Sequence, residues 1–245
     1  SLDGAFETVL PDHTVWGPRH AARLKLGLSA GEQLDALGVI KRAAGDVDQF
    51  TAFARVAANP WLVSLQDAGI DLPGLGRAYE PLVVAKLATR VQGNDGLYSA
   101  FPYDAQLLYD FRLEVALAEA DAGTKRSLEH LRQTLQPIVR DHGQPLPYAA
   151  ILKADGDRMG KLLERARDPD ASRQISAALH RFASSVRTLV RQHAGHAIYA
   201  GGDDVLALVA VTDALPCARA LADAFELRMR PVAESLGLPA SDYPS

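Results

Sequence analysis

The sequence predicts an α+β fold, in which a helical N-terminal part is followed by a part that mixes strands and helices. Between residues 32 and 142 the apolar residues recur mostly at helical spacing, whereas short apolar runs alternate with long amphipathic segments from residue 148 onward. The glycine- and proline-containing stretch 143–147 separates these two patterns. We therefore expect a helical domain over residues 1–145 and a mixed domain over residues 146–245.

Composition narrows the class of protein. The chain has 245 residues, of which 48% are hydrophobic and 23% charged, and these values are typical of a soluble globular protein. Its net charge of −4 means that any contact with nucleic acid requires a local basic patch. The single cysteine, Cys217, excludes an internal disulfide. We see no apolar run long enough to span a membrane and no signal-peptide pattern, so we expect a cytoplasmic protein.

The helical part begins with an irregular stretch over residues 1–30. Apolar spacing then predicts helices over 32–45, 47–58 and 77–91. We expect Pro60 to end the second of these helices, and the segment 92–96 to form a turn. Two further helices are predicted between Asp104 and His142, the second with Thr124 as its N-cap.

The mixed part has the order strand, helix, helix, strand, turn, strand, helix. The predicted segments are a buried strand at 148–152, helices at 159–167, 172–193 and 213–236, and a hairpin of strands 196–200 and 205–209. A strand that returns through a helical crossover is most simply parallel to its successor. We therefore expect the strands at 148–154 and 196–200 to run parallel in one sheet, with their C-terminal ends at the same edge.

The hairpin turn carries the sequence Gly201-Gly202-Asp203-Asp204. A tight turn needs its glycines, but it does not need two adjacent carboxylates, which repel each other unless a cation lies between them. Asp155 follows the first strand and is expected at the same sheet edge. With the carbonyl of Gly156, the three carboxylates predict a site for two divalent cations, Mg²⁺ or Mn²⁺.

The segment after Asp155 has features of a phosphate site. Gly156, Met159 and Gly160 open a predicted helix, whose N–H groups attract anions, and Lys161 can reach a phosphate. Asp157 is the weakest candidate, since it fits a cap or a surface residue as well as a ligand. Taken singly, an Asp-x-Asp after a strand is usually a helix cap and a Gly-Gly-Asp-Asp is usually a turn. Metal ligands beside a helix N-terminus suit nucleotidyl transfer with two ions about 3.5–4 Å apart.

Residues 152–161 and 199–208 together resemble the second palm domain of the large polymerase-like subunit of type III-B CRISPR effector complexes. Residues 31–42 also resemble the helical linker that precedes this palm in the family. The resemblance implies a ferredoxin-like palm, related to those of nucleotide cyclases, that continues beyond residue 245 with at least one more strand. It thus implies that residues 1–145 are the linker domain and residues 146–245 an incomplete palm.

The resemblance also implies an activity and its participants. ATP would be joined into cyclic oligoadenylate when the complex, with its other subunits and guide RNA, binds a target RNA. Asp155 and Asp203 would be metal ligands, and Asp204 a ligand or a neighbour of one. The implied catalytic residues are Asp155, Asp203 and Asp204, and the implied nucleotide-binding residues are Gly156, Asp157, Met159, Gly160, Lys161, Gly201 and Gly202.

Two other interpretations remain open at the level of sequence. One is a palm that has lost its chemistry and acts as a scaffold in the ribonucleoprotein complex. The other is a different second-messenger cyclase, although Asp203-Asp204 replaces the Glu-Glu-Phe ending typical of diguanylate cyclases. The chain contains no His-Asp dipeptide, so DNA cleavage is not assigned to it.

Overall fold

A computed structural model describes residues 52–91 and 96–245, which lie in one compact unit that begins at Thr51. The predicted helix at 32–45, the linker-like motif at 31–42 and most of the turn at 92–96 lie outside the described residues. The described part has helices first and a small antiparallel sheet with its own helices afterwards, so the predicted α+β class is confirmed. None of the helices described is long and apolar enough to cross a lipid bilayer.

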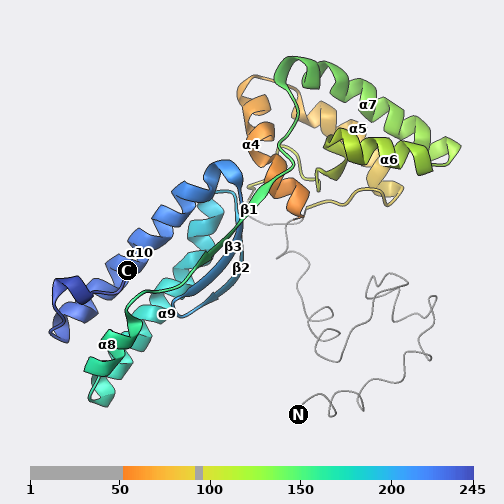
Figure 1. Cartoon of the computed structure of the whole chain (residues 1–245). Helices are drawn as coiled ribbons and strands as arrows, with labels where there is room; N and C mark the ends of the chain where they lie inside the picture. Colours follow the sequence, from red (N-terminus) through yellow and green to blue (C-terminus); the bar gives the residue numbers. More distant parts are fainter. Residues whose placement is uncertain (1–51, 92–95) are drawn as a thin grey trace, which may run out of the picture. The chain divides into compact units, whose positions relative to one another are not determined.

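The helical part contains α4 (Phe53–Asp67), α5 (Leu72–Val84), the short helix η3 (Gln106–Leu108), α6 (Asp110–Glu119) and α7 (Ala122–His142) (Figure 1). These elements share one core built mainly from leucines and aromatic residues, in which Tyr79, Phe101 and Tyr103 form a cluster with ring centroids 5.0–5.2 Å apart. One face of each helix is buried in this core, as the spacing of the apolar residues in each helix predicts.

Three details of the helical part differ from prediction. Pro60 does not end a helix but lies inside α4, where neighbouring Trp61, Leu62 and Leu65 are buried in the core and offset the lost backbone hydrogen bond. The predicted helix at 77–91 is α5, which begins earlier and ends at Val84. The N-cap of α7 is Asp121 and not Thr124, since the Asp121 carboxylate accepts hydrogen bonds from the backbone N–H groups of residues 123 and 124.

The second part contains β1 (Ala149–Ala154), α8 (Met159–Arg165), α9 (Pro169–Gln192), β2 (His196–Gly201), β3 (Asp204–Ala210), η4 (Val211–Asp213), α10 (Ala214–Ser235) and η5 (Ala240–Asp242). The sheet has the strand order β1-β3-β2, and β3 is antiparallel to both neighbours. β1 and β2 therefore run in the same direction, as predicted, but β3 lies between them. Their C-terminal ends still meet at one edge.

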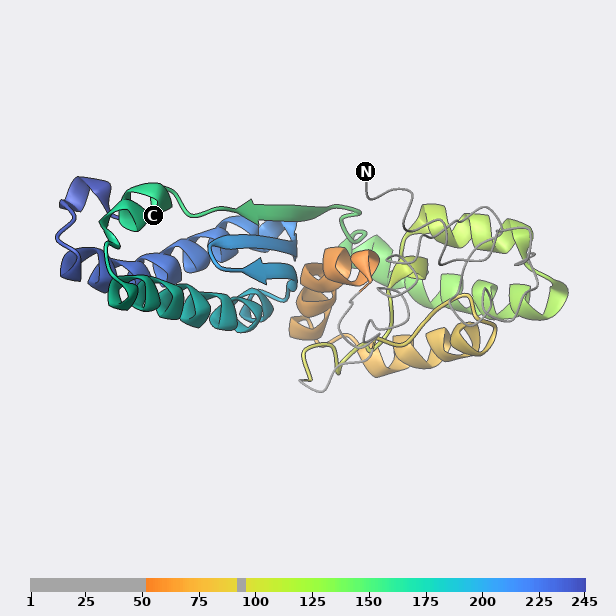
Figure 2. The ribbon, with the colours of Figure 1, turned by 90° about the horizontal axis from the view of Figure 1, so that it is seen from below.

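In the part of the chain that the structure describes, helices cover one face of the sheet. α9 and α10 pack against each other and lie along that face (Figures 1 and 2). Val205, Ala207 and Val209 of β3 point into the core beneath them, together with Phe182 and Phe225 from the two helices. Among the described residues no helix covers the opposite face, so the prediction of a buried first strand is wrong: Tyr148 is 68% exposed and Ile151 71% exposed.

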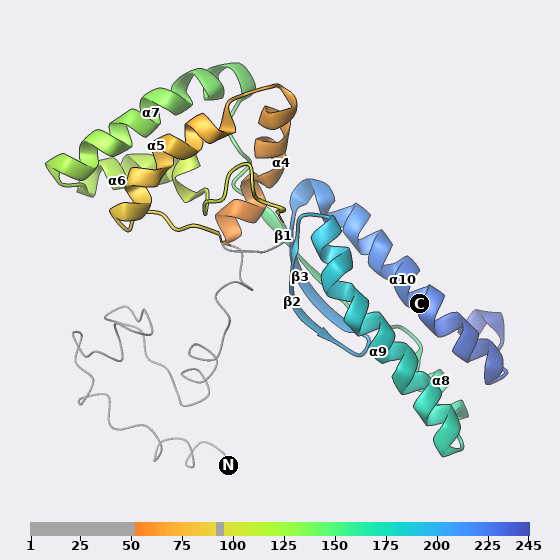
Figure 3. The ribbon, with the colours of Figure 1, turned by 180° about the vertical axis from the view of Figure 1, so that it is seen from behind.

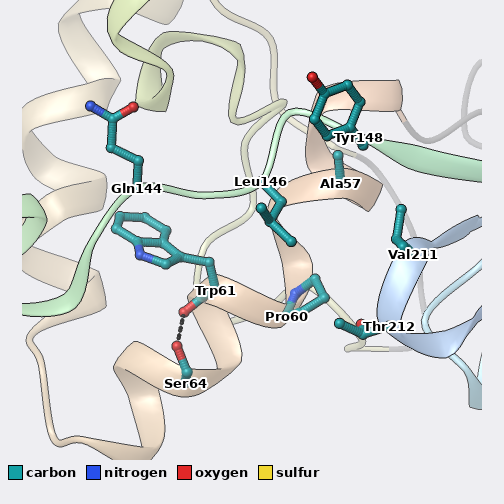
Figure 4. A pocket seen from close by; sticks show the side chains of 9 residues that line it. All are labelled: Ala57, Pro60, Trp61, Ser64, Gln144, Leu146, Tyr148, Val211 and Thr212. Atoms are coloured by element: carbon teal, nitrogen blue, oxygen red, sulfur yellow. Dashed lines mark hydrogen bonds between the residues drawn. The ribbon is translucent and has the colours of Figure 1, made fainter.

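A cavity of about 230 Å³ lies between α4, the segment before β1 and η4 (Figure 4). Trp61, Leu146, Tyr148 and Val211 supply most of its apolar wall, and Ser64 and Gln144 supply polar groups. Its lining contains no titratable carboxylate, histidine, lysine or cysteine side chain, so its chemistry is that of a packing gap rather than of a catalytic site.

Candidate functional site

The acidic turn is a two-residue hairpin loop. Gly201 pairs with Asp204, which leaves Gly202 and Asp203 as the two residues of the loop. Gly202 has φ +66°, a conformation that favours glycine, whereas the φ of Asp203 is not positive. Positive φ at the first loop position alone is the pattern of a type II′ turn, whose twist matches that of the paired strands.

Gly201 is required for space around it, whereas Gly202 is required for its positive φ. A Cβ atom placed on Gly201 would lie 2.2 Å from the hydroxyl oxygen of Tyr199, so the Tyr199 side chain lies over this glycine. Tyr199 is 55% exposed, and its ring lies on the open face of the sheet next to the acidic turn. The family resemblance implies that Gly201 lets a nucleotide approach the turn; in the structure the Tyr199 ring lies over this glycine, and the nucleotide contact stays a prediction.

The register of the sheet brings Asp155 toward Asp204. Ala154, the last residue of β1, is opposite Val205 of β3, and the next step of the same register sets Asp155 opposite Asp204. Both side chains are exposed. Like charges directly opposite each other destabilise an antiparallel pair, so this arrangement is unfavourable for stability without a compensating cation.

Because Gly156 has no side chain, the loop after β1 can lie against Asp203 at the same edge of the sheet. A Cβ atom on Gly156 would lie 2.8 Å from Cβ and 3.3 Å from Oδ2 of Asp203, and 2.7 Å from Cζ of Phe225. Phe225 is buried and packs edge-on against Phe182, with ring centroids 5.1 Å apart. Glycine at position 156 therefore allows the loop after β1 to contact the acidic turn and to pack on the Phe225 ring.

The donor types at this edge fit a hard divalent cation, since carboxylate and carbonyl oxygens are the ligands that Mg²⁺ and Mn²⁺ take. Asp155 and the carbonyl of Gly156 lie on the loop after β1, and Asp203 and Asp204 lie on the hairpin turn at the same edge. In the described ranges no three His, Cys, Asp or Glu side chains surround a common point. The carboxylates are therefore brought to one edge but are not arranged as a closed set of ligands.

Lys161 forms an ion pair with a carboxylate of the C-terminal segment. Its Nζ lies 2.7 Å from Oδ1 of Asp242, and this hydrogen bond holds the pKa of Asp242 below its usual value. Arg158 donates to the carbonyl of Tyr243 at 3.1 Å, and the Asp157 N–H donates to the carbonyl of Ser245 at 3.0 Å. The C-terminus thus lies beside α8, as Figure 2 shows.

The helix that follows the predicted phosphate-binding loop begins at the predicted residue but ends two residues earlier than expected. α8 begins at Met159 and ends at Arg165, and it follows Arg158, which has φ +64°. A Cβ atom on Gly160 would meet nothing within 4 Å, so the loop is open to an approaching ligand at that position. Asp157 is exposed and its backbone N–H donates to the carbonyl of Ser245; whether its carboxylate is a ligand stays a prediction.

Sequence reasoning missed Tyr199 and Asp242 as neighbours of the site. Tyr199 stands two residues before Gly201, and alternation along a strand would have placed the two on one face. Asp242 lies 81 residues beyond Lys161, in a segment for which no local pattern predicts a partner. Whether the acidic residues bind metal or nucleotide stays a prediction.

Residues 148–240 match the model of a protein family described as Cas10/Cmr2, second palm domain. A search of the curated proteins found no match. The matched range covers all three strands, α8, α9 and α10, and therefore the whole edge at which the acidic residues meet.

The fold and the matched range define a palm domain of the polymerase-like class. Residues 148–240 match the second palm domain of the Cas10/Cmr2 family, and this match supports a polymerase-like subunit of a type III CRISPR effector complex.

Proposed function

We propose that the sheet edge at Asp155, Asp203 and Asp204 binds ATP with Mg²⁺ or Mn²⁺ and joins it into cyclic oligoadenylate within the CRISPR effector complex. One observation carries the proposal. Gly156 lies against Asp203 while the register sets Asp155 opposite Asp204, so segments distant in sequence bring three carboxylates to one edge. Without a bound cation, this arrangement of like charges lowers the stability of the fold. The palm-domain match also supports a nucleotidyltransferase function.

Four oxygen-donor groups from the two loops would hold the ions. Asp155 and Asp203, with the carbonyl of Gly156, would bind one ion, and Asp204 would complete or neighbour the second. When bound, such ions lower the pKa of an attacking hydroxyl and neutralise the charge of the triphosphate and leaving group. The chain's own contribution is to hold the carboxylates at one edge, where Gly156 permits the close approach of the two loops.

The nucleotide would lie across the two loops. The open space at Gly160 and the turn at Gly202, where an added Cβ would meet no neighbour within 4 Å, leave the backbone accessible. Lys161 would bind a phosphate after exchanging its Asp242 partner, because carboxylate and phosphate are both anionic oxygen acceptors for an ammonium group. Tyr199 offers a half-exposed ring beside the turn, and such rings stack on bases.

The test is product formation by the assembled complex. The complex with its target RNA and ATP is expected to yield cyclic oligoadenylates, separated by chromatography and identified by mass. Asp203→Ala with Asp204→Ala is expected to abolish them, because both carboxylates of the turn are removed. Asp223→Ala with Glu234→Ala, which removes two acids from α10 instead, is expected to leave the products unchanged.

Unchanged products from the Asp203→Ala, Asp204→Ala variant would contradict the catalytic assignment. Failure of the unaltered domain to bind ATP in the presence of Mn²⁺ would leave the scaffold interpretation, in which the palm only positions other subunits. The two results separate a wrong residue assignment from a wrong function.

A further inference from the structure

The face of the sheet that points away from α9 and α10 carries apolar side chains. Figure 3 shows both helices on one side of the three strands. Leu206 and Leu208 of β3 alternate with the buried residues of that strand and therefore lie on the other side, where Ile151 of β1 is opposite Leu208. Contiguous exposed apolar surface of this kind marks a site at which a ligand or a partner binds.

One row across this face combines three kinds of side chain. Lys153 of β1 is opposite Leu206 of β3, and Tyr199 of β2 is opposite the same leucine. Residues directly opposite each other in an antiparallel pair have Cβ atoms about 4.5–5.5 Å apart on one face. A lysine, a leucine and a tyrosine therefore lie side by side across the three strands. Lys153 and Tyr199 are both exposed.

The Lys153–Leu206–Tyr199 row lies next to the acidic edge. Two residues from its members along the respective strands, and hence on the same face, come Asp155, Asp204 and Gly201. The rise of two strand residues is about 7 Å. The Tyr199 ring crosses this interval, since a Cβ atom on Gly201 would meet its hydroxyl end. A ligand held by the carboxylates thus has an exposed aromatic ring beside it.

We propose, on the basis of the function proposed above, that the Lys153–Leu206–Tyr199 row holds the nucleoside and one phosphate of the nucleotide bound at the acidic edge. The base would stack on the Tyr199 ring beside Leu206, as bases of every kind stack on aromatic side chains. The Lys153 stem would lie along the apolar face, and its ammonium group would donate to a phosphate oxygen at the edge. The nucleotide therefore lies on the open face of the sheet.

Charge favours a nucleotide over an apolar protein surface as the occupant of this row. An apolar partner that covered Lys153 would remove its ammonium group from water without supplying an acceptor. A nucleotide offers an aromatic face to Tyr199 and an anionic oxygen to Lys153, so it satisfies both side chains. Because stacking does not read the edge of the base, the row is expected to bind ATP and GTP with similar affinity.

The test is calorimetric titration of the full chain, in the presence of Mn²⁺, with ATP, GTP and inorganic tripolyphosphate. Tyr199→Ala is expected to weaken the binding of ATP and GTP about 5- to 100-fold, because the stacked base loses its ring. The binding of tripolyphosphate, which has no base, is expected to change by less than about twofold. Tyr199→Phe keeps the ring and is expected to restore the binding of ATP. Tyr148→Ala removes another exposed tyrosine, at the opposite end of β1, and is expected to leave all three affinities unchanged.

A second variant tests the phosphate contact. Lys153→Met keeps the apolar stem and removes the ammonium group, so it is expected to weaken ATP, GTP and tripolyphosphate alike, by about 3- to 10-fold. Lys125→Met on α7 removes the same charge from another exposed helix face and is expected to leave the three affinities unchanged. Thermal unfolding of each variant separates a loss of binding from a loss of folding.

The outcomes separate this row from the function proposed for the edge. Equal ATP affinities of the unaltered chain and of Tyr199→Ala would overturn the proposal, and the apolar face would then fit a protein partner instead. The expected losses of affinity, together with an assembled complex that forms no cyclic oligoadenylate, would support the row and contradict the proposed function. Binding of neither ATP nor tripolyphosphate by the unaltered chain would overturn both.

Discussion

Gly156→Ala tests whether the loop after β1 touches the acidic turn. The added methyl group would lie 2.7 Å from Cζ of Phe225 and 2.8 Å from Cβ of Asp203, well inside van der Waals contact. Neither atom can move freely, because Phe225 is held in the core against Phe182 and Cβ of Asp203 is fixed by the turn. Overpacking of this kind costs about 1–3 kcal/mol of unfolding free energy.

That cost is measurable by thermal unfolding. For a unit of this size, 1 kcal/mol lowers Tm by about 2–4 °C, so Gly156→Ala is expected to lower it by about 2–12 °C. The matched control is Gly160→Ala, since a methyl group there meets nothing within 4 Å and alanine is the better helix former. The control is expected to unfold at or above the temperature of the unaltered protein.

Equal unfolding temperatures for Gly156→Ala and Gly160→Ala would refute the reasoning. They would mean that the two loops are not in contact, and the three carboxylates would then lack the feature that brings them to one edge. A loss of Mn²⁺-induced stabilisation in Gly156→Ala alone would link the contact to the proposed metal site.

Three further predictions concern the turn, the C-terminal segment and a half-buried histidine. Gly202→Ala is expected to destabilise the domain by about 1–2 kcal/mol in chemical denaturation, because alanine disfavours the positive φ, and Gly202→Asn by less. Asp242→Asn is expected to tighten ATP binding by less than about fivefold in calorimetry, because Lys161 no longer has a competing carboxylate; weaker binding would show that Asp242 supports the site. His196 has a lowered pKa through burial, so the folded state binds fewer protons than the unfolded state between the two pKa values. Stability is therefore expected to fall as pH drops below about 6.5, and His196→Asn is expected to reduce this dependence in urea titrations at pH 5.5 and 7.5; an unchanged dependence would contradict the assignment.

Much of the structure of residues 146–245 could be predicted, because the sequence patterns that determine its helices and its hairpin are local. The hairpin of β2 and β3 follows from two apolar runs around a glycine-rich turn, and α9 and α10 follow from long apolar periodicities. The shared direction of β1 and β2 followed from the helical crossover. Their separation by β3 did not, because strand order depends on pairing between distant segments.

The errors came from tertiary packing that overrides local preference. Pro60 normally interrupts a helix, but burial of Trp61, Leu62 and Leu65 keeps α4 continuous. The pattern of β1 could not show that one sheet face is open, since apolar residues occupy both faces. The buried Asp104, which accepts hydrogen bonds from Tyr79 and Thr89, gave no sequence signal, because its partners come from distant parts of the chain.

The position of the acidic residues at one sheet edge was predictable, their geometry only in part, and their role stays a prediction. Asp155, Asp203 and Asp204 follow strand ends, so their common edge could be expected from topology. The particular pairing, Gly156 against Asp203 and Asp155 opposite Asp204, depends on register and on the space left by a missing side chain. The partner of Lys161 depends on how the segment after α10 folds back, which no spacing rule describes.

The most direct test of the metal-dependent nucleotide site is anomalous diffraction from crystals of the protein soaked with Mn²⁺ and ATP. The account predicts anomalous peaks within about 2.0–2.6 Å of carboxylate oxygens of Asp155, Asp203 or Asp204, with the triphosphate toward Lys161. Density for ATP and Mn²⁺ elsewhere on the molecule, or no peak at this edge in crystals that bind ATP, would contradict it.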